Sequence, residues 1–458
     1  MSGCCLLAGD SILAELSLLS QGDPDPSTGR LFTYIYEAGD DGLRRLAEEA
    51  YRMLLHTNML DPTVFKSALA LERELVGYAL RLAGGVDEAV GTATYGGTES
   101  IALALLAARE EYYSRHGRSA PAPKVVAPVT VHPSVGKAAW LLGMRLARVP
   151  VEPGSMKARL EAVAEAIDGS TILLVASAPN FPYGTIDPVR DMAELASDRG
   201  ILLHVDACIG GFILPHMEAL GEPVEPWGFQ VEGVTSISMD MHKYGYTPKG
   251  VSFILFRESR LKEHTIYVDL SWPGYPFINT TLLSSRSAAP LAAAWAVYKY
   301  LGDEGYRRLA GMVLDARSRI LGGLAGLGFR SIAPVESPLL ALTLPSQEDL
   351  LAYYAGITAR GWVLGLQTPV KGLAPYNIHL TLSPVHQRVA EDFIEDSRAA
   401  IEEGRMILAR LEEELASGDV LQLVTSGGSL AIARLLETLD PGEAEALARS
   451  LVVEVYRG

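Results

Sequence analysis

The sequence predicts an α/β protein whose large domain has a mostly parallel sheet covered by helices, followed by a smaller C-terminal α/β domain. The first observation is that short β-rich runs alternate with segments of helical periodicity between about residues 86 and 260. Strands that alternate with helices favour a parallel sheet. The second is that these runs are apolar on both faces, as in strands that helices cover on both sides. Beyond about residue 303 the alternation is less regular, which indicates the smaller domain.

The elements follow in chain order from the same patterns. Residues 41–83 have helical spacing of apolar residues, interrupted at 58–62. In the large domain we expect strands at 125–131, 171–176, 201–205, 234–239 and 251–256, with helices at 101–115, 156–167 and 188–198. Beyond it we expect a helix at 304–324, strands at 339–344, 362–366 and 378–382, and helices at 385–416 and 430–455. The predicted division is therefore an N-terminal helical segment (1–85), the large domain (86–302), the small α/β domain (303–415) and a helical C-terminal extension (416–458).

Composition excludes several classes of protein. The 458 residues are 48% hydrophobic and 21% charged, which is typical of a globular chain. A net charge of −16 disfavours nucleic acid and anionic membranes as partners. The three cysteines, Cys4, Cys5 and Cys208, have no metal-ligand spacing, so we expect no metal site and a reduced, intracellular setting. Charges interrupt the apolar N-terminal stretch and no long apolar window occurs, so we expect a cytoplasmic protein without a signal peptide or stable membrane insertion.

A glycine-rich loop at 94–100 directly precedes a long helical segment. Gly97 and Thr98, at the start of a helix, make a site for an anion such as a phosphate. Alternatively, Thr98 only caps the helix, with Glu99 favourable in its first turn. The loop is neither a Walker loop nor a dinucleotide-binding fingerprint, which disfavours a nucleotide-binding protein.

Three further candidates follow β-rich runs, and ligands of open α/β sheets bind at the carboxyl ends of strands. His132 could stack on a flat heteroaromatic ring, or cap the helix that begins near Pro133. Asp206 ends a buried strand and needs a cationic partner, such as a protonated pyridine nitrogen; capping of the next helix and metal binding are alternatives. Lys243, beside His242, lies in a partly apolar and positively charged neighbourhood that should lower its pKa, as an imine-forming amine requires. A lone lysine would simply be a surface residue.

In their order and spacing these motifs resemble the fold-type I enzymes that use pyridoxal 5′-phosphate (PLP). Within them, the chain is most similar to the glutamate-decarboxylase-like group and to the sphingosine-1-phosphate lyases. The resemblance rests on the segments 96–100, 177–187, 205–212 and 236–250, and covers roughly residues 40–410.

The resemblance implies roles for the matching residues. Lys243 would form the Schiff base with PLP, Asp206 would pair with the pyridine nitrogen, and His132 would stack on the ring. Other implied positions are Gly97 and Thr98 at the phosphate, His242 near the phosphate or the reacting centre, Cys208 under the ring, Lys249 at the substrate's phosphate, and Ser285 and Arg286 in a loop lent to the neighbouring subunit. A homodimer with shared active sites is implied as well.

The implied reaction is a retro-aldol cleavage of a phosphorylated amino alcohol to an aldehyde and an amine. The alternative is decarboxylation of an aromatic or acidic L-amino acid, which uses the same ring and lysine. The chain departs from the lyases at Asp61, where they have a histidine. A non-catalytic scaffold is disfavoured because the lysine, aspartate, histidine and phosphate loop are all retained.

Overall fold

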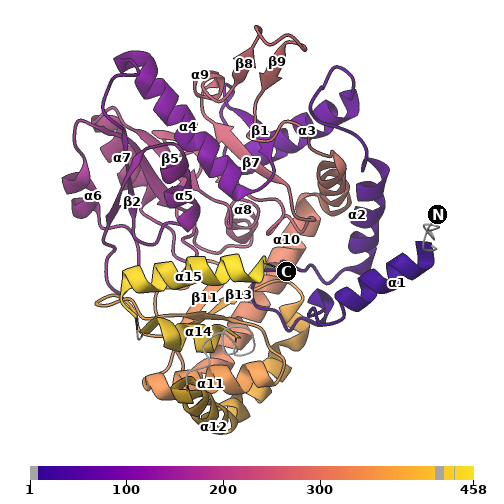
Figure 1. Cartoon of the computed structure of the whole chain (residues 1–458), viewed down its shortest axis with the longest axis vertical. Helices are drawn as coiled ribbons and strands as arrows, with labels where there is room; N and C mark the ends of the chain where they lie inside the picture. The colour runs from indigo at the N-terminus through magenta and orange to yellow at the C-terminus, as the bar shows by residue number, and fades with distance from the viewer. Residues whose placement is uncertain (1–8, 418–427, 438, 458) are drawn as a thin grey trace.

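The computed structural model describes residues 9–417, 428–437 and 439–457 (Figure 1). Its largest sheet has seven strands in the order β1-β7-β6-β5-β4-β2-β3. All neighbouring pairs are parallel except the two that β7 makes with β1 and β6. The strands are β1 (Val90–Thr94), β2 (Lys124–Pro128), β3 (Arg145–Val149), β4 (Thr171–Ser177), β5 (Leu202–Asp206), β6 (Val234–Met239) and β7 (Ser252–Phe256). The predicted α/β class and mostly parallel sheet are confirmed.

Both faces of this sheet are buried under helices. Val126 and Leu174 pack into one core cluster, while Val125 and Leu173, their neighbours along the strands, pack into another. Burying each such side chain stabilises the fold by about 1.5–3 kcal/mol. The helices of this part of the chain are α4 (Gly97–His116), α5 (Pro133–Leu141), α6 (Leu160–Ala166), α7 (Val189–Asp198), α8 (Leu214–Glu218) and α9 (Ser259–Glu263). A hairpin, β8 (Tyr267–Asp269) and β9 (Phe277–Asn279), follows them.

Two strands of the large sheet were not predicted, and both lie at its edges. β1 contains a glycine and two threonines, and β3 contains two arginines. An edge strand faces solvent along one side, so it needs no continuous apolar run. Its sequence therefore lacks the signal by which the central strands were found.

The second sheet has four antiparallel strands in the order β10-β11-β13-β12. They are β10 (Arg330–Ser331), β11 (Leu339–Thr343), β12 (Gly365–Gln367) and β13 (Asn377–Thr381). The strand expected at 362–366 is displaced toward the C-terminus. Residue Val363 instead bonds to the N-terminal segment, where Phe32 donates its N–H to the Val363 carbonyl at 2.7 Å. This segment then leads to Tyr36, whose ring lies 4.9 Å from that of Tyr244.

Long helices cover the second sheet and connect it to the first (Figure 1). They are α10 (Ala289–Ala325), α11 (Gln347–Ala359) and α12 (His386–Ser417). The helix expected at 304–324 thus begins earlier, with Pro290 in its first turn, and Gly302 interrupts it with a φ of 54°. α11 and α12 pack closely, because Gly356 and Gly404 bring one backbone against the other.

Helices also occupy both ends of the chain. α1 (Gly9–Leu19), which lies in the predicted N-terminal helical segment but before its expected helical spacing at 41–83, precedes α2 (Asp41–Met53) and α3 (Lys66–Leu82), and the expected break between these two is present. The predicted C-terminal helical stretch consists of α14 (Gly428–Glu437) and α15 (Pro441–Val455), and α15 lies across the front of Figure 1 between α5 and α14. In the described ranges, no helix has both the length and the apolar character to cross a membrane. Cys4 and Cys5 lie outside the described residues.

Candidate active site

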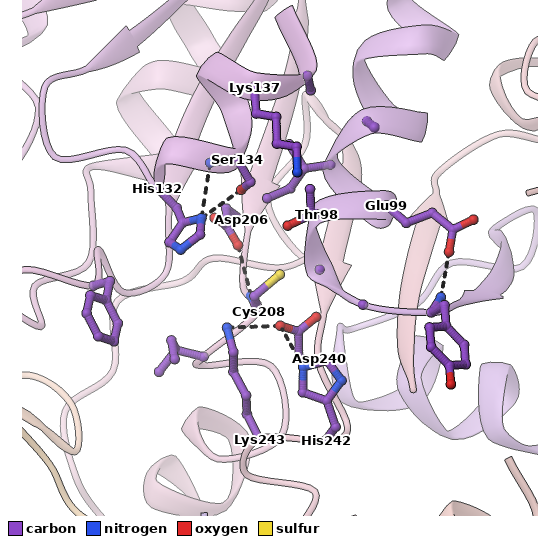
Figure 2. A pocket seen from close by; sticks show the side chains of 18 of the residues that line it. Thr98, Glu99, His132, Ser134, Lys137, Asp206, Cys208, Asp240, His242 and Lys243 are labelled. Carbon is purple, nitrogen blue, oxygen red and sulfur yellow. Dashed lines mark hydrogen bonds and ion pairs between the residues drawn. The ribbon is translucent and has the colours of Figure 1, made fainter. Parts of the chain in front are cut away.

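A cavity of about 610 Å³ lies at the carboxyl ends of β5 and β6 and at the N-terminus of α4. Parallel strands bring side chains from distant parts of the chain to this edge of the sheet. The cavity is lined by the following residues from the sequence analysis: Gly97, Thr98, His132, Asp206, Cys208, His242 and Lys243. Figure 2 shows His132 and Asp206 side by side, with Lys243 approaching Asp240 from another wall.

Lys243 lies in the turn after β6, and its amine forms an ion pair with a buried carboxylate. Its Nζ is 2.9 Å from Oδ2 of Asp240, whose side chain is 2% exposed. Burial lowers the pKa of Lys243, but the negative charge of Asp240 and its acidic neighbours outweighs burial, so the pKa is raised. The expectation of a lowered pKa, drawn from the apolar and basic neighbours in sequence, is therefore wrong.

His242 is the neighbour on which that expectation depended, and it carries no positive charge at neutral pH. Burial lowers its pKa to about 4, despite the nearby charge of Asp240. Its Nε2 is 3.6 Å from Asp240 Oδ2, and its Nδ1 is 3.4 Å from the Ser252 hydroxyl. It thus contributes a neutral ring to the cavity wall.

The N-terminus of α4 is open toward the cavity. Gly96 is the N-cap residue, and no side chain caps the helix there. Thr98 lies inside the first turn, so the alternative that it caps the helix is wrong. The first amides of a helix have no carbonyl partner within it. Those of Gly97 and Thr98 can therefore bind an anion.

Gly97 permits a close approach that no larger residue would allow. A Cβ at this position would lie 2.7 Å from Asp240 Oδ2 and 2.8 Å from Cys208 Sγ. The buried Glu99 holds the same turn, accepting the N–H of Tyr95 at 2.6 Å and that of Leu282 at 2.7 Å. The anion loop is thus fixed against the strand ends on one side and residue 282 on the other.

His132 caps α5, as one of its two predicted functions requires, and it also lies in the cavity wall. Its Nδ1 accepts the Ser134 N–H at 3.2 Å and so caps α5, and its ring also lines the cavity. Removal of water by the surrounding protein lowers its pKa, so the ring is neutral at pH 7. A flat neutral ring at this position can stack on a heteroaromatic ligand.

Asp206 has its predicted place at the end of β5, where its carboxylate accepts hydrogen bonds from neutral groups. Its Oδ1 accepts the Cys208 N–H at 3.1 Å and the Ser238 hydroxyl at 3.3 Å. His204, behind Ser238, is neutral, because burial lowers its pKa to about 4. Within the described part of the chain, no basic side chain forms an ion pair with Asp206. A bound cation, such as a protonated pyridine nitrogen, suits this carboxylate.

The residues with predicted substrate roles lie outside this chain's cavity lining. The Lys249 amine donates to the His242 carbonyl at 3.2 Å, and burial lowers its pKa to about 8. Arg286 donates to the Ala93 carbonyl at 2.8 Å, and Ser285 is exposed. Asp61 forms a local turn with Thr63. Lys249 therefore lies near Lys243 without lining the cavity, whereas Ser285, Arg286 and Asp61 are not among the residues that line the cavity with Lys243.

Several cavity residues were missed by sequence reasoning. Asp240 lies within the lysine motif, three residues before Lys243, but received no role. Phe181 lies in a quoted segment, and its carbonyl is 2.8 Å from His379 Nε2. Lys137 follows Ser134 by one turn of α5, and its amine points toward Thr98 (Figure 2). The spacing of three residues could have identified Lys137, because it places Lys137 on the same face of α5 as Ser134, which bonds to His132.

Comparisons with known proteins agree with this geometry. A family model described as "Pyridoxal-dependent decarboxylase conserved domain" matches residues 68–316, which include every residue that lines the cavity. A sphingosine-1-phosphate lyase from Arabidopsis thaliana is 34% identical over 377 residues, which are 81% of this chain and 67% of that protein. A probable L-tyrosine/L-aspartate decarboxylase from Methanothrix thermoacetophila is 33% identical over 332 residues, 72% of this chain and 81% of the other.

A solved structure extends the likeness to the fold. The sphingosine-1-phosphate lyase of Burkholderia pseudomallei superposes with a TM-score of 0.82 at 31% identity, covering 93% of this chain and 97% of the other. The fold-type I expectation is thereby confirmed, and the open helix end, Asp206 and His132 fit PLP. The chain belongs to the pyridoxal-dependent decarboxylase family and is a PLP-dependent lyase.

Proposed function

We propose that this enzyme cleaves a phosphorylated amino alcohol to an aldehyde and an amine by a retro-aldol reaction, with Lys243 as the Schiff-base lysine. The observation that carries the proposal is the convergence of Lys243, Asp206 and the open end of α4 on one cavity. Similarity to sphingosine-1-phosphate lyases over four fifths of the chain supports this reaction over others of the family.

Each wall of the cavity would hold one part of the cofactor. The amides of Gly97 and Thr98 would bind the phosphate, with His242 beside it, and Asp206 would keep a proton on the ring nitrogen. His132 would cover one ring face, while Cys208, whose thiol stays protonated because burial raises its pKa, would pack under the other. When bound, PLP supplies an electron sink for the bond that breaks beside the substrate nitrogen.

The second candidate is an L-amino-acid decarboxylase acting on an aromatic or acidic substrate. The similarity to the Methanothrix decarboxylase supports it. The two reactions differ in which bond of the substrate the cavity orients perpendicular to the ring. Lys137, at the side of Thr98, is the cavity residue best placed to bind an anionic group of either substrate.

Product analysis separates the two candidates. The PLP-loaded protein is incubated with a phosphorylated long-chain amino alcohol and, separately, with a panel of L-amino acids. We expect aldehyde from the first and no carbon dioxide from the second. Carbon dioxide from an amino acid, without aldehyde, would replace the lyase by a decarboxylase. Release of neither product by wild-type enzyme would leave both proposals unsupported.

A methyl group at residue 97 should disturb the phosphate site. In Gly97→Ala the new Cβ would push the first turn of α4 away from Asp240 and Cys208. Because misplacement by about 1 Å can cost roughly 10²-fold in rate, we expect a loss of that order together with weaker PLP binding. Fluorescence titration with PLP and steady-state kinetics measure the two effects. Gly77→Ala, in α3 with open space around it, is the matched control and should change neither.

The proposal includes a cytoplasmic homodimer with shared active sites. It is motivated by Ser285 and Arg286, which have implied site roles but do not line the cavity of their own chain. Light scattering at assay concentrations measures the oligomeric state. Mixing Lys243→Ala with Arg286→Ala chains tests sharing, since only shared sites would let two inactive variants restore activity.

The four-part domain division also stays a prediction.

A further inference from the structure

The cavity contains one buried carboxylate to which the roles above assign no function. Asp240 directly follows β6, and its side chain is 2% exposed. Its Oδ2 lies 2.9 Å from Lys243 Nζ and 3.6 Å from His242 Nε2. The carboxylate is also held in place by close packing, since both its oxygens lie within 2.8 Å of where a Cβ on Gly97 would be.

The charges around Asp240 leave the Lys243 nitrogen as its counter-ion. The ionisable side chains that face this pair come from several elements: Tyr36, His132, Asp206, Cys208, His242 and Lys249. Burial keeps His242 neutral at pH 7, and it keeps the Tyr36 hydroxyl protonated by raising its pKa to about 12. The Lys249 amine donates to the His242 carbonyl instead. Within the described residues, only Lys243 therefore gives Asp240 a direct ion pair that is charged at neutral pH.

A buried carboxylate without a positive partner is costly. Asp240 cannot relieve that cost by turning to solvent, because it is enclosed by the α4 turn and the strand end. Its charge is therefore most favourable when the nitrogen beside it carries a proton. This holds whether that nitrogen is a free amine or is bonded to the aldehyde carbon of PLP.

We propose that Asp240 holds a proton on the Lys243 nitrogen while this nitrogen is bonded to PLP. The inference rests on the proposed function, in which Lys243 is the Schiff-base lysine. Asp240 would then serve as the fixed negative charge beside the reacting nitrogen. It is distinct from Asp206, which lies at the end of another strand and faces the ring nitrogen in that proposal.

The experiment is a pH titration of the absorbance of PLP-loaded enzyme. A Schiff base absorbs in the visible when its nitrogen is protonated and in the near ultraviolet when it is not. A negative charge favours the protonated form, so it raises the pH at which the visible band disappears. In Asp240→Asn that transition should occur at lower pH, by about 1–3 pH units, as expected for loss of an opposite charge within 4 Å. The control is Glu111→Gln, which neutralises a buried carboxylate roughly 20 Å farther along α4.

Borohydride reduction, followed by mass spectrometry of the peptide that contains Lys243, separates the proposed role of Asp240 from the proposed function of the enzyme. If PLP is attached to Lys243 in both proteins but the transition pH is the same, the role of Asp240 is wrong and the proposed function stands. An equal shift of the transition pH in Glu111→Gln would also overturn that role, because loss of any buried carboxylate would then have the same effect. If wild-type Lys243 carries no PLP, the proposed function itself fails. Asp240→Ser, which removes the same charge with less volume, carries the same prediction should the asparagine variant not fold.

Discussion

Replacing Lys243 by alanine is expected to abolish the covalent attachment of PLP and to reduce turnover by roughly 10⁴-fold or more, the scale of losing a covalent catalytic residue. The physical reason is that, among the described residues, Lys243 is the lysine whose amine forms an ion pair with Asp240 at the strand ends. The visible absorbance band and the rate of product release measure the effect. Stopped-flow mixing with substrate distinguishes lost chemistry from lost binding.

Two other lysines make this prediction specific. Lys137 also lines the cavity, whereas the Lys262 amine donates to the Gly91 carbonyl outside it. Lys262→Ala should retain both the band and the activity. If Lys137→Ala loses the covalent attachment while Lys243→Ala retains it, the assignment of the Schiff-base lysine is wrong.

Placing a methyl group at Gly404 is expected to lower the free energy of unfolding by about 1–3 kcal/mol, the usual cost of overpacking. A Cβ there would overlap the Ala352 carbonyl oxygen on α11, and one at Gly356 would overlap the Ala400 carbonyl on α12. The two backbones must therefore separate. Urea unfolding followed by tryptophan fluorescence reports on this region, because the buried Trp362 donates its indole N–H to Asp396 of α12.

The matched control is another glycine in a helix interior. A Cβ at Gly322 of α10 would meet no atom within 4 Å. Gly322→Ala should therefore leave stability unchanged or raise it by up to about 1 kcal/mol, through helix propensity alone. Equal destabilisation by both substitutions would show that the contact between α11 and α12 is not the cause.

Local sequence patterns were sufficient to predict the central strands and the residues that follow them. Residues such as Val205 and Ile237 lie in continuous apolar runs, so β5 and β6 were found, and with them the residues that follow each strand. Because these strands are parallel neighbours, Asp206 and Lys243 come to one edge although far apart in sequence. The edge strands had no comparable signal.

The charge state of the lysine could not be derived in this way. Sequence proximity placed His242 next to Lys243 and suggested a basic neighbourhood, but Asp240 is the group that faces the amine. Which of two nearby side chains points at a third depends on the turn after β6, and no periodicity encodes that turn. The functions of Lys249, Ser285 and Arg286 stay predictions, and those of Ser285 and Arg286 depend on a partner subunit that receives their loop.

The capping bond of His132 has a consequence for proton transfer. Nδ1 lies 3.2 Å from the Ser134 amide nitrogen and 2.7 Å from the Ser134 hydroxyl oxygen, and when both groups donate to it the single proton of the neutral ring resides on Nε2. The first turn of α5 thus sets the orientation of the imidazole and favours this tautomer. In this tautomer the Nε2 edge of the ring is a hydrogen-bond donor, which suits an anionic group and not the removal of a proton.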